Sequence, residues 1–431
     1  PMKYHPITSE LFTKNRRRLT EKLKPNSLVV LNSNDIMPTN ADGTMKFVQN
    51  SDLFYLSGID QEESILVLCP DFPDENFREI LFVRETNKEI AIWEGHKYTK
   101  EEATQTSGIE KVMWTSQFEK TFFTLMAQAE HVYLNTNEHI RASVSVQTRD
   151  ARFVEWCRIN YPLHQYQRLA PLMHYLRAIK SEHEVTLMQQ ACNITRDAFL
   201  RVLKFVKPGV MEYEIEAEYI HEFVRQRSRG FAYEPIVASG KNACVLHYLD
   251  NSEECQAGDL LLMDVGAEYA NYNADMTRTI PVSGQFTDRQ RAVYNAVLRV
   301  QREAMQLLRP GNVIKEYHKE VGKIMESELI GLGLLDRTDV KNQNENHFLD
   351  RKYFMHGTSH HLGLDVHDVG NIYREFESGM VFTVEPGVYI WEENMGIRLE
   401  NNVVIQEDGL DDLMGDIPIE ADEVETLMNE K

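Results

Sequence analysis

Two segments of this 431-residue chain place carboxylates inside runs of apolar residues, and this pattern restricts the possible folds more than any other feature. The first segment, LLLMDVGAEYANYNADMTRTIPV, carries Asp264 and Asp275. The second segment, VFTVEPGVYIWEENMGIRLENNVVI, carries Glu385 and Glu400. Each segment is typical of two strands around a turn, with the first turn near residues 269–270 and the second near EENMG. With these turns, the two carboxylates of each segment lie opposite each other across a hairpin.

Carboxylates directly opposed across strands repel each other and destabilise a sheet. Apolar neighbours such as Met263 and Val384 indicate that these carboxylates are buried. Several buried anions without partners would cost many kcal/mol or would become protonated. A bound cation resolves that conflict. The alternative is that one pair lies at an exposed turn and the other forms a salt bridge, with Arg278 or Arg398.

The segment HGTSHHLGLDVHDVG adds four histidines close to the second hairpin. In an extended chain His356 and His360 share a face, and His361 points away. Glycines and small polar residues argue against a helix here, and the segment contains no HExxH zinc motif. A single histidine is more often a core or surface residue than a ligand, but this density favours a ligand role. His247, in ACVLHYLD, is a further candidate.

Four carboxylates and one imidazole are a suitable ligand set for two divalent metal ions. Hard oxygen ligands favour Mn(II), Co(II), Mg(II) or Zn(II) over thiolate-binding metals. Four negative charges balance two dications, and shared carboxylates hold such ions roughly 3.5–4 Å apart. The sequence therefore predicts a buried two-metal hydrolase site.

The second part of the chain contains a candidate internal repeat. A capping-box pattern, S-x-x-E at residues 181–184, opens a long helix that ends at KPG, residues 207–209. About a hundred residues later, T-x-x-Q at residues 287–290 opens another helix, which ends at RPG, residues 309–311. Each is followed by a second helix and a strand-rich stretch. Two similar halves whose helices cover one curved sheet are expected, although helices ending in Pro-Gly are common by chance.

The first part of the chain, residues 1–176, is typical of a mixed α/β domain. SELFTKNRRRLTEKLKP predicts an amphipathic helix stopped by Pro25. SLVVLNS, SILVLCP, EILFVRE and AIWEG predict short strands. A packed junction near residue 176 is expected to lead into a second domain, residues 177–431.

The composition excludes some classes of partner. The formal net charge of −21 argues against nucleic acid, which attracts basic surfaces. No apolar run is long enough to span a membrane. The five cysteines lack a CxxC pair, and the first residues show no signal-peptide pattern. These features predict a cytoplasmic protein.

Together these residues resemble the pita-bread metallopeptidases, and within them the branch of aminopeptidase P and prolidase. The matching motifs are IVASGKNACVLHY, LLLMDVGAEYANYNADMTRTIPVSG, FMHGTSHHLGLDVHDVG, TVEPGVYI and GIRLENNVVI, over about residues 180–410. FVQNSDLFYLSGIDQEESILVL resembles the amino-terminal domain of aminopeptidase P. The resemblance implies an α+β pita-bread catalytic domain, with a curved antiparallel sheet, backing helices and a pseudo-twofold axis. A smaller mixed α/β domain precedes it.

The resemblance also implies how the ligands are divided. Asp264 would be a terminal, bidentate ligand of one metal, while Asp275 and Glu400 would bridge. His360 and Glu385 would complete the other metal. A hydroxide between the two ions would be the nucleophile, and the family favours Mn(II).

Other residues match family positions around the metals. His247, His356 and His367 match histidines that contact substrate and help to move protons. Tyr233 and Arg398 match residues that orient ligands by hydrogen bonds. Protonation of the leaving proline nitrogen would fall to Glu385 or to a histidine.

The implied activity is release of the N-terminal residue from peptides with proline in second position. A homodimer or homotetramer is implied, in which Trp93 reaches a neighbouring subunit's active site; the alternative is an ordinary core or surface tryptophan. A prolidase, which cleaves Xaa-Pro dipeptides only, shares the DVHDVG stretch, but the N-terminal match favours aminopeptidase P. A non-catalytic peptide-binding protein of this fold usually lacks ligands that this chain retains.

Overall fold

A computed structural model describes residues 2–344 and 347–430 of the chain. It divides into two compact units, Pro1–Arg177 and Ala178–Lys431, and the boundary expected from the sequence lies one residue earlier. Within the described residues, every helix is too short or too polar to cross a membrane.

The first unit is built on a six-stranded mixed sheet in the order β4-β3-β2-β1-β5-β6. Strand β1 lies at its centre, antiparallel to β2 and parallel to β5, and all six of its residues are buried. Such burial on both faces explains why the run LVVL within this strand is continuously apolar. The strands are β1 (Ser27–Asn32), β2 (Ile65–Leu68), β3 (Glu79–Val83), β4 (Val112–Trp114), β5 (His131–Leu134) and β6 (Gln165–Arg168). The helices are α1 (Ser9–Thr20), α2 (Ser51–Ser57), α3 (Lys88–Glu94), α4 (Lys100–Ser107), α5 (Phe118–Met126), α6 (Arg149–Asn160) and α7 (Ala170–Arg177).

The strand predicted at AIWEG is wrong, because this segment belongs to helix α3. The Asn87 side chain accepts a hydrogen bond from the Ile90 amide and caps the helix, and Gly95, at φ 77°, ends it. A short apolar run fits a helix or a strand equally well, and here the capping residues decide. Trp93 is 89% exposed on this helix.

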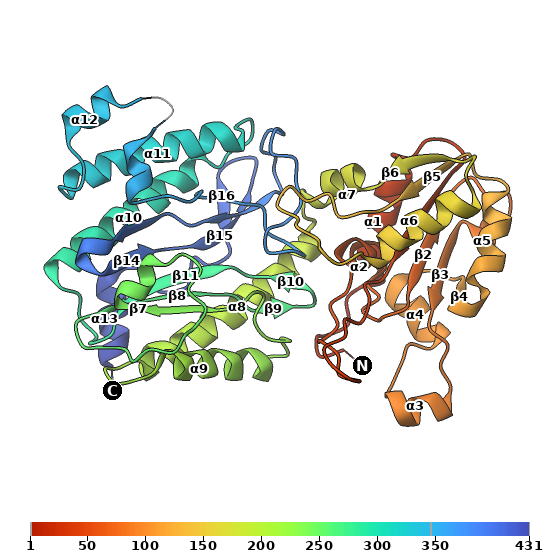
Figure 1. Ribbon diagram of the computed structural model, residues 1–431, viewed down its shortest axis with the longest axis horizontal. Coiled ribbons are helices and arrows are strands. Elements are labelled where there is room, and N and C mark those ends of the chain that lie inside the picture. Colours follow the sequence, from red (N-terminus) through yellow and green to blue (C-terminus); the bar gives the residue numbers. More distant parts are fainter. Residues whose placement is uncertain (1, 345–346, 431) are drawn as a thin grey trace. The chain divides into compact units, whose positions relative to one another are not determined.

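The second unit consists of antiparallel ladders flanked by two helix pairs, as the sequence predicted. In Figure 1 helices α8 and α9 run along one side of its strands, and α10 and α11 run along the other. The helices are α8 (Glu182–Phe205), α9 (Glu212–Arg225), α10 (Asp288–Leu307), α11 (Ile314–Gly331), α12 (Arg337–Asn342) and α13 (Ala421–Asn429). The strands are β7 (Ile236–Ser239), β8 (Leu260–Val265), β9 (Glu268–Tyr269), β10 (Tyr272–Asn273), β11 (Met276–Pro281), β12 (Val381–Val384), β13 (Gly387–Ile390), β14 (Met395–Arg398), β15 (Asn401–Ile405) and β16 (Leu410–Asp412).

The two helix pairs repeat the same local chemistry. Helices α8 and α10 both begin with a complete capping box, formed by Ser181 with Glu184 and by Thr287 with Gln290. Both are followed by a Pro-Gly turn whose glycine has φ 90°. Because a positive φ is strained for most residues, glycine is needed at this point in each half. The predicted internal repeat is therefore present in the helices.

The first hairpin has a different centre from the predicted one. Ala270 and Asn271 form the turn with φ 51° and 69°, so the turn lies one residue later than expected. Both turn residues have positive φ, which suits the twist of a two-residue hairpin. Asp264 consequently lies opposite Thr277, and Asp275 is a diagonal neighbour rather than the opposed residue. Since side chains alternate with a period of two, both carboxylates still share one face.

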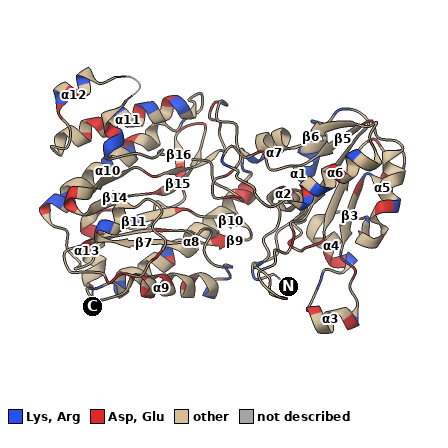
Figure 2. Cartoon of the chain, in the orientation of Figure 1, with Lys and Arg blue, Asp and Glu red and all other residues tan. Residues whose placement is uncertain are grey.

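The second hairpin keeps the predicted register. Its two ladders, β12 with β15 and β13 with β14, share one alignment, which pairs Val384 with Asn401 and Gly387 with Arg398. In that alignment Glu385 lies opposite Glu400. An isolated bridge between Thr277 and Glu400 joins this hairpin to the first one. In Figure 2 most charged residues of the second unit lie on its helices and its strands are mostly uncharged. Asp264 lies within β8, whereas Asp275, Glu385 and Glu400 lie directly beside strand ends.

The first hairpin leaves no room for a side chain at Gly266. A Cβ there would lie 1.8 Å from the carbonyl oxygen of Ala274 on the opposite strand. We expect Gly266→Ala to lower the free energy of unfolding of the metal-free protein by roughly 2 kcal/mol or more. Gly331→Ala is the control, because a Cβ there has no heavy atom within 4 Å. Urea unfolding followed by circular dichroism measures both; equal losses, or none at Gly266, would contradict the close packing.

Candidate metal centre

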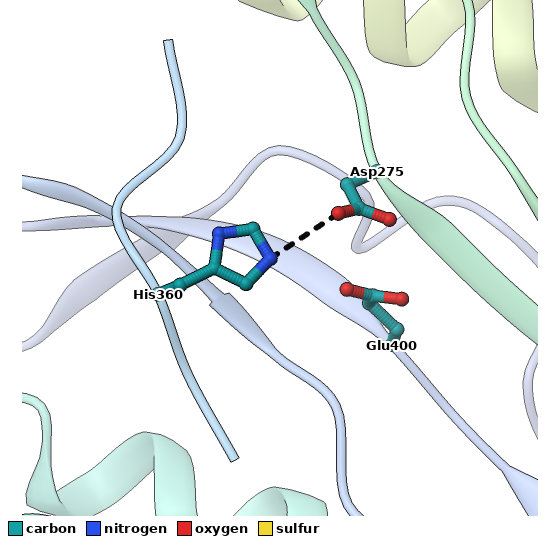
Figure 3. Close-up of side chains that lie close together, drawn as sticks. All are labelled: Asp275, His360 and Glu400. Carbon is teal, nitrogen blue, oxygen red and sulfur yellow. Dashed lines mark ion pairs between the residues drawn. The ribbon is translucent and has the colours of Figure 1, made fainter. Parts of the chain in front are cut away.

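The structure brings the carboxylates of both hairpins to one imidazole. Ligating atoms of Asp275, His360 and Glu400 all lie within 4.8 Å of one another. Figure 3 shows the three side chains pointing toward a common centre. Glu385 joins them through His360, and Asp264 joins them through Tyr233, so all five residues expected from the sequence meet here.

The imidazole of His360 is held in one orientation. Its Nδ1 lies 2.8 Å from the carbonyl oxygen of His361, which can only accept a hydrogen bond, so Nδ1 carries the hydrogen. Nε2 therefore points toward the carboxylates, 3.3 Å from an oxygen of Asp275 and 3.3 Å from one of Glu385. This is the tautomer that a metal-binding histidine needs.

Glu400 is a buried carboxylate that is only half satisfied. Its side chain is fully buried, and Oε2 accepts a 2.6 Å hydrogen bond from the Thr277 hydroxyl. Oε1 is buried and has no hydrogen-bond partner among the described residues. Buried polar atoms in native proteins almost always have a partner, so an orphaned oxygen needs an explanation.

Asp264 and Asp275 share one hydroxyl group. The Tyr233 hydroxyl lies 2.6 Å from Asp264 Oδ1 and 2.8 Å from Asp275 Oδ1. Because a phenol has a single hydrogen, it can donate to only one of two ionised carboxylates. The arrangement requires a further proton or a cation between these two residues.

The salt-bridge alternative holds for one of the four carboxylates. Arg398 donates from Nη2 to Asp264 Oδ2 over 2.8 Å. The guanidinium of Arg278 instead donates to three backbone carbonyls and to the Asn401 side chain. Arg398 alone cannot neutralise the whole cluster, which leaves a cation deficit at the centre.

The pKa values of Glu400, Asp264 and His360 reflect this shortage of positive charge. Burial raises the pKa of Glu400 well above its usual value, with Asp275, Glu385 and Asp264 adding to the rise. Burial also raises the pKa of Asp264 to about 7, although Arg398 opposes it. Burial lowers the pKa of His360, but contacts with Asp275 and Glu385 outweigh it and raise that pKa to about 10. Without a metal, protons hold the cluster together.

These residues fit divalent metal ions. The set contains four carboxylates and one correctly oriented imidazole nitrogen, which are typical ligands of Mn(II), Co(II) and Zn(II). The orphaned Glu400 Oε1 and the doubly contacted Tyr233 hydroxyl both need an additional positive charge at the same place. A metal would replace the protons that the cluster otherwise retains.

The remaining histidines take different roles. His356 accepts a hydrogen bond at Nε2 from the Tyr389 hydroxyl over 2.7 Å, and burial lowers its pKa. His367 is exposed, and its ring stands edge-on to His360 with centroids 4.5 Å apart. His361 packs on Phe382, away from the cluster as predicted, and its pKa falls to about 3 through burial and the charge of Lys180.

His247 is exposed on the segment that follows the short 3-10 helix η3 (Gly240–Cys244).

Sequence reasoning missed three residues that support the centre. Tyr389 accepts a hydrogen bond from Arg398 over 2.7 Å and so links it to His356. The Asn402 side chain accepts a hydrogen bond from the Asp275 amide and donates one to the Asp275 carbonyl oxygen. The Thr277 hydroxyl donates to Glu400. Tyr389 could have been found, because it lies two residues from Gly387, which pairs with Arg398. The contacts of Asn402 and Thr277 cross between hairpins, and no local pattern predicts them.

The raised carboxylate pKa values predict an unusual pH dependence for the metal-free protein. A carboxyl whose pKa is higher when folded than when unfolded stabilises the fold at low pH and loses that contribution as the pH rises. We therefore expect Glu400→Gln to gain stability over the wild type from pH 5 to pH 8, by about 1.4 kcal/mol per pH unit at most.

The measurement is thermal unfolding of chelator-treated protein at both pH values. Added Mn(II) should reverse the order by stabilising the wild type more than the variant. Identical pH profiles for the two proteins would show that Glu400 is not a strained carboxyl.

Comparison with known protein families agrees with this geometry. Residues 186–407 match metallopeptidase family M24, and residues 12–133 match the N-terminal domain of aminopeptidase P. The curated Xaa-Pro aminopeptidase of Escherichia coli is 35% identical, with 98% of each chain covered. Human Xaa-Pro aminopeptidase 3 is 30% identical over 93% of this chain and 81% of its own length.

Solved structures extend the likeness to the whole fold. Aminopeptidase PepP of Pseudomonas aeruginosa superposes with a TM-score of 0.89 at 30% identity, covering 98% of both chains. Zinc-substituted aminopeptidase P of E. coli, in complex with product, gives a TM-score of 0.86 at 35% identity, covering 98% of this chain and 99% of that one. The predicted combination of a mixed α/β domain with a pita-bread catalytic domain is confirmed. The chain therefore belongs to metallopeptidase family M24, within its aminopeptidase P group.

Proposed function

We propose that this chain is an Xaa-Pro aminopeptidase that works through two metal ions held by Asp264, Asp275, His360, Glu385 and Glu400. It releases the N-terminal residue from peptides whose second residue is proline. Similarity to Xaa-Pro aminopeptidases over nearly the full chain supports the activity. The convergence of the five side chains, with the orphaned Glu400 Oε1 at their centre, is the observation that carries the metal assignment.

Two divalent ions, when bound, would activate a water molecule at neutral pH and polarise the scissile carbonyl. Mn(II) is our choice among the ions that this ligand set accepts, on the family resemblance. In this scheme, which follows the family resemblance, Asp275 and Glu400 would contribute to both sites, Asp264 would hold one ion, and His360 and Glu385 would hold the other. The carboxylates supply the four negative charges that two dications need.

The other polar residues orient this centre. Arg398 binds Asp264, the Tyr389 hydroxyl and Thr277, and so ties three groups into one rigid unit. Tyr233 keeps Asp264 and Asp275 at a fixed separation. Held by such hydrogen bonds, ligands do not need to reorganise when substrate binds.

Proton movement falls to the histidines and Glu385. His356 accepts a hydrogen bond at Nε2 from the Tyr389 hydroxyl, and we place it on the substrate side. His367 is exposed beside His360, where it can donate to a substrate carbonyl. We place His247 with His367 on the substrate side. The proline nitrogen that leaves must gain a proton, which Glu385 or one of these histidines can deliver.

The exposed tryptophan and the buried cysteines bear on assembly and location. Trp93, 89% exposed on helix α3, fits the role of a residue that reaches a neighbouring subunit in a homodimer or homotetramer. All five cysteines are free and buried, which fits a reducing compartment such as the cytoplasm.

A metal-reconstitution assay on proline peptides of different lengths tests the proposed function. We expect chelated protein to be inactive and to recover activity with Mn(II), and to cleave Xaa-Pro-Xaa tripeptides and longer peptides. Release of the first residue is followed by chromatography, with Xaa-Ala-Xaa peptides as the control. Rapid cleavage of Gly-Pro with inert tripeptides would identify a prolidase instead, and absence of any divalent metal dependence would favour a peptide-binding protein.

Two substitutions separate ligands from substrate-side residues. Asp275→Asn should abolish turnover and weaken Mn(II) binding while leaving the circular dichroism spectrum unchanged, because a carboxylate ligand is lost. His367→Ala should lower turnover about a hundredfold with metal content unchanged, a typical contribution of one acid–base group. Metal content is measured by elemental analysis after dialysis. Loss of metal from the His367 variant, or activity in the Asp275 variant, would redraw the ligand set.

A further inference from the structure

A buried ion pair lies beneath the histidine segment, outside the metal ligands. Lys180 Nζ lies 2.8 Å from Asp368 Oδ2, and each side chain is only 1% exposed. Burying two charges costs solvation that their attraction repays only in a good geometry. An apolar pair of similar size would fill the same space at lower cost, so packing alone does not explain the pair.

The pair joins two parts of the second unit that are far apart in sequence. The Lys180 amide donates to the Gly379 carbonyl oxygen over 2.9 Å, which fixes the lysine beside the start of strand β12. Gly363 passes directly over the pair, because a Cβ there would lie 2.4 Å from Asp368 Oδ2 and 2.9 Å from Lys180 Cε. Asp368 therefore anchors the loop of residues 361–368 to a rigid point.

That loop is closed at its base by one carbonyl group. The Asp368 amide donates to the His361 carbonyl oxygen over 2.9 Å. The same oxygen accepts the hydrogen bond from His360 Nδ1 over 2.8 Å, which sets the direction of the His360 ring. A shift of Asp368 would therefore move the group that orients His360.

Asp368 also fixes the position of His367. His367 immediately precedes Asp368, and its ring packs edge-on against His360 at 4.5 Å between centroids. On the other side of the loop, the Asn273 side chain donates to the carbonyl oxygens of Gly363 and Leu364. The loop is thus held from strand β10 at one point and by Lys180 at another.

We propose that the Lys180–Asp368 ion pair is a positioning element of the catalytic centre, which holds the 361–368 loop so that His360 and His367 face the metals and the substrate together. This inference rests on the proposed function for the roles of the two histidines. The pair itself takes no part in the chemistry. Because both charges are buried and Lys180 is fixed by its backbone bond to Gly379, Asp368 has to stay beside Lys180 to remain neutralised.

A double substitution separates positioning from stability. Lys180→Met or Asp368→Asn alone leaves one buried charge without its partner and should lower the melting temperature. Lys180→Met with Asp368→Leu removes both charges and should melt close to the wild type. We expect the kcat of this double variant to be at least about tenfold lower than that of the wild type, and its KM to stay within about threefold of the wild-type value.

Two further readouts do not depend on activity. Amide hydrogen exchange of residues 361–368 in the metal-free double variant should rise about tenfold, because the loop is no longer anchored. Titration of Mn(II) into metal-free protein should show about tenfold weaker binding. Glu328→Gln, which removes the exposed 2.7 Å pair with Arg299, is the control and should leave kcat, exchange and Mn(II) affinity unchanged.

The outcomes are distinct. Wild-type kcat and exchange in the double variant would overturn the proposal and make the pair merely structural; so would a change confined to KM. If the double variant does not fold, Asp368→Asn at low temperature provides the same exchange and kcat comparison. A wild type that fails to cleave proline peptides with Mn(II) present would reject the proposed function, while the exchange data would still decide whether the pair holds the loop.

Discussion

The backbone hydrogen bond between the Glu400 amide and the Thr277 carbonyl oxygen, 3.0 Å long, joins the two hairpins of the catalytic unit. It brings strands β11 and β15 side by side, although the residues it connects are more than a hundred positions apart. Each hairpin alone carries one pair of carboxylates. This junction, together with the Asn402–Asp275 and Thr279–Arg398 hydrogen bonds, places both pairs around a single imidazole.

The junction concentrates negative charge in a buried place, and many of the surrounding groups partly neutralise that charge. Arg398 neutralises Asp264, His360 lies between Asp275 and Glu385, and Thr277 satisfies one oxygen of Glu400. One oxygen stays without a partner among the described residues, and the pKa of Glu400 rises. A protein gains nothing in stability from such strain, which is characteristic of sites kept for function. A bound metal would convert the same carboxylates from a destabilising cluster into a stabilising one.

Orientation around the centre is transmitted by hydrogen bonds from groups that do not bind metal. Tyr389 connects Arg398 to His356, and the His361 carbonyl connects His360 to the loop anchored by Asp368. These contacts originate on different strands and loops of the same unit. Rigid support of this kind explains how exposed residues such as His367 can act with defined geometry beside a buried cluster.

Elements that depend on neighbouring residues could be predicted from the sequence. The turn positions paired the carboxylates across each hairpin, their apolar neighbours indicated burial, and the capping boxes located helices α8 and α10. The first turn lies one residue later than predicted, which shifts the pairing of the two strands by two residues. Because side chains alternate with a period of two, Asp264 and Asp275 still lie on the same face. Family resemblance then supplied the ligand set. At AIWEG, where local pattern was ambiguous, the predicted strand was wrong.

The groups that meet across elements could not be predicted from the sequence, because their contacts arise from the packing of the whole unit. The Thr277–Glu400 junction, the choice of Asp264 rather than another carboxylate as the partner of Arg398, and the Lys180–Asp368 pair all join distant segments. Such contacts depend on how whole ladders and loops pack, and no spacing within one segment encodes that packing. The physical reason is that alternation and capping are local, whereas neutralising a buried charge requires a partner from wherever the fold brings one.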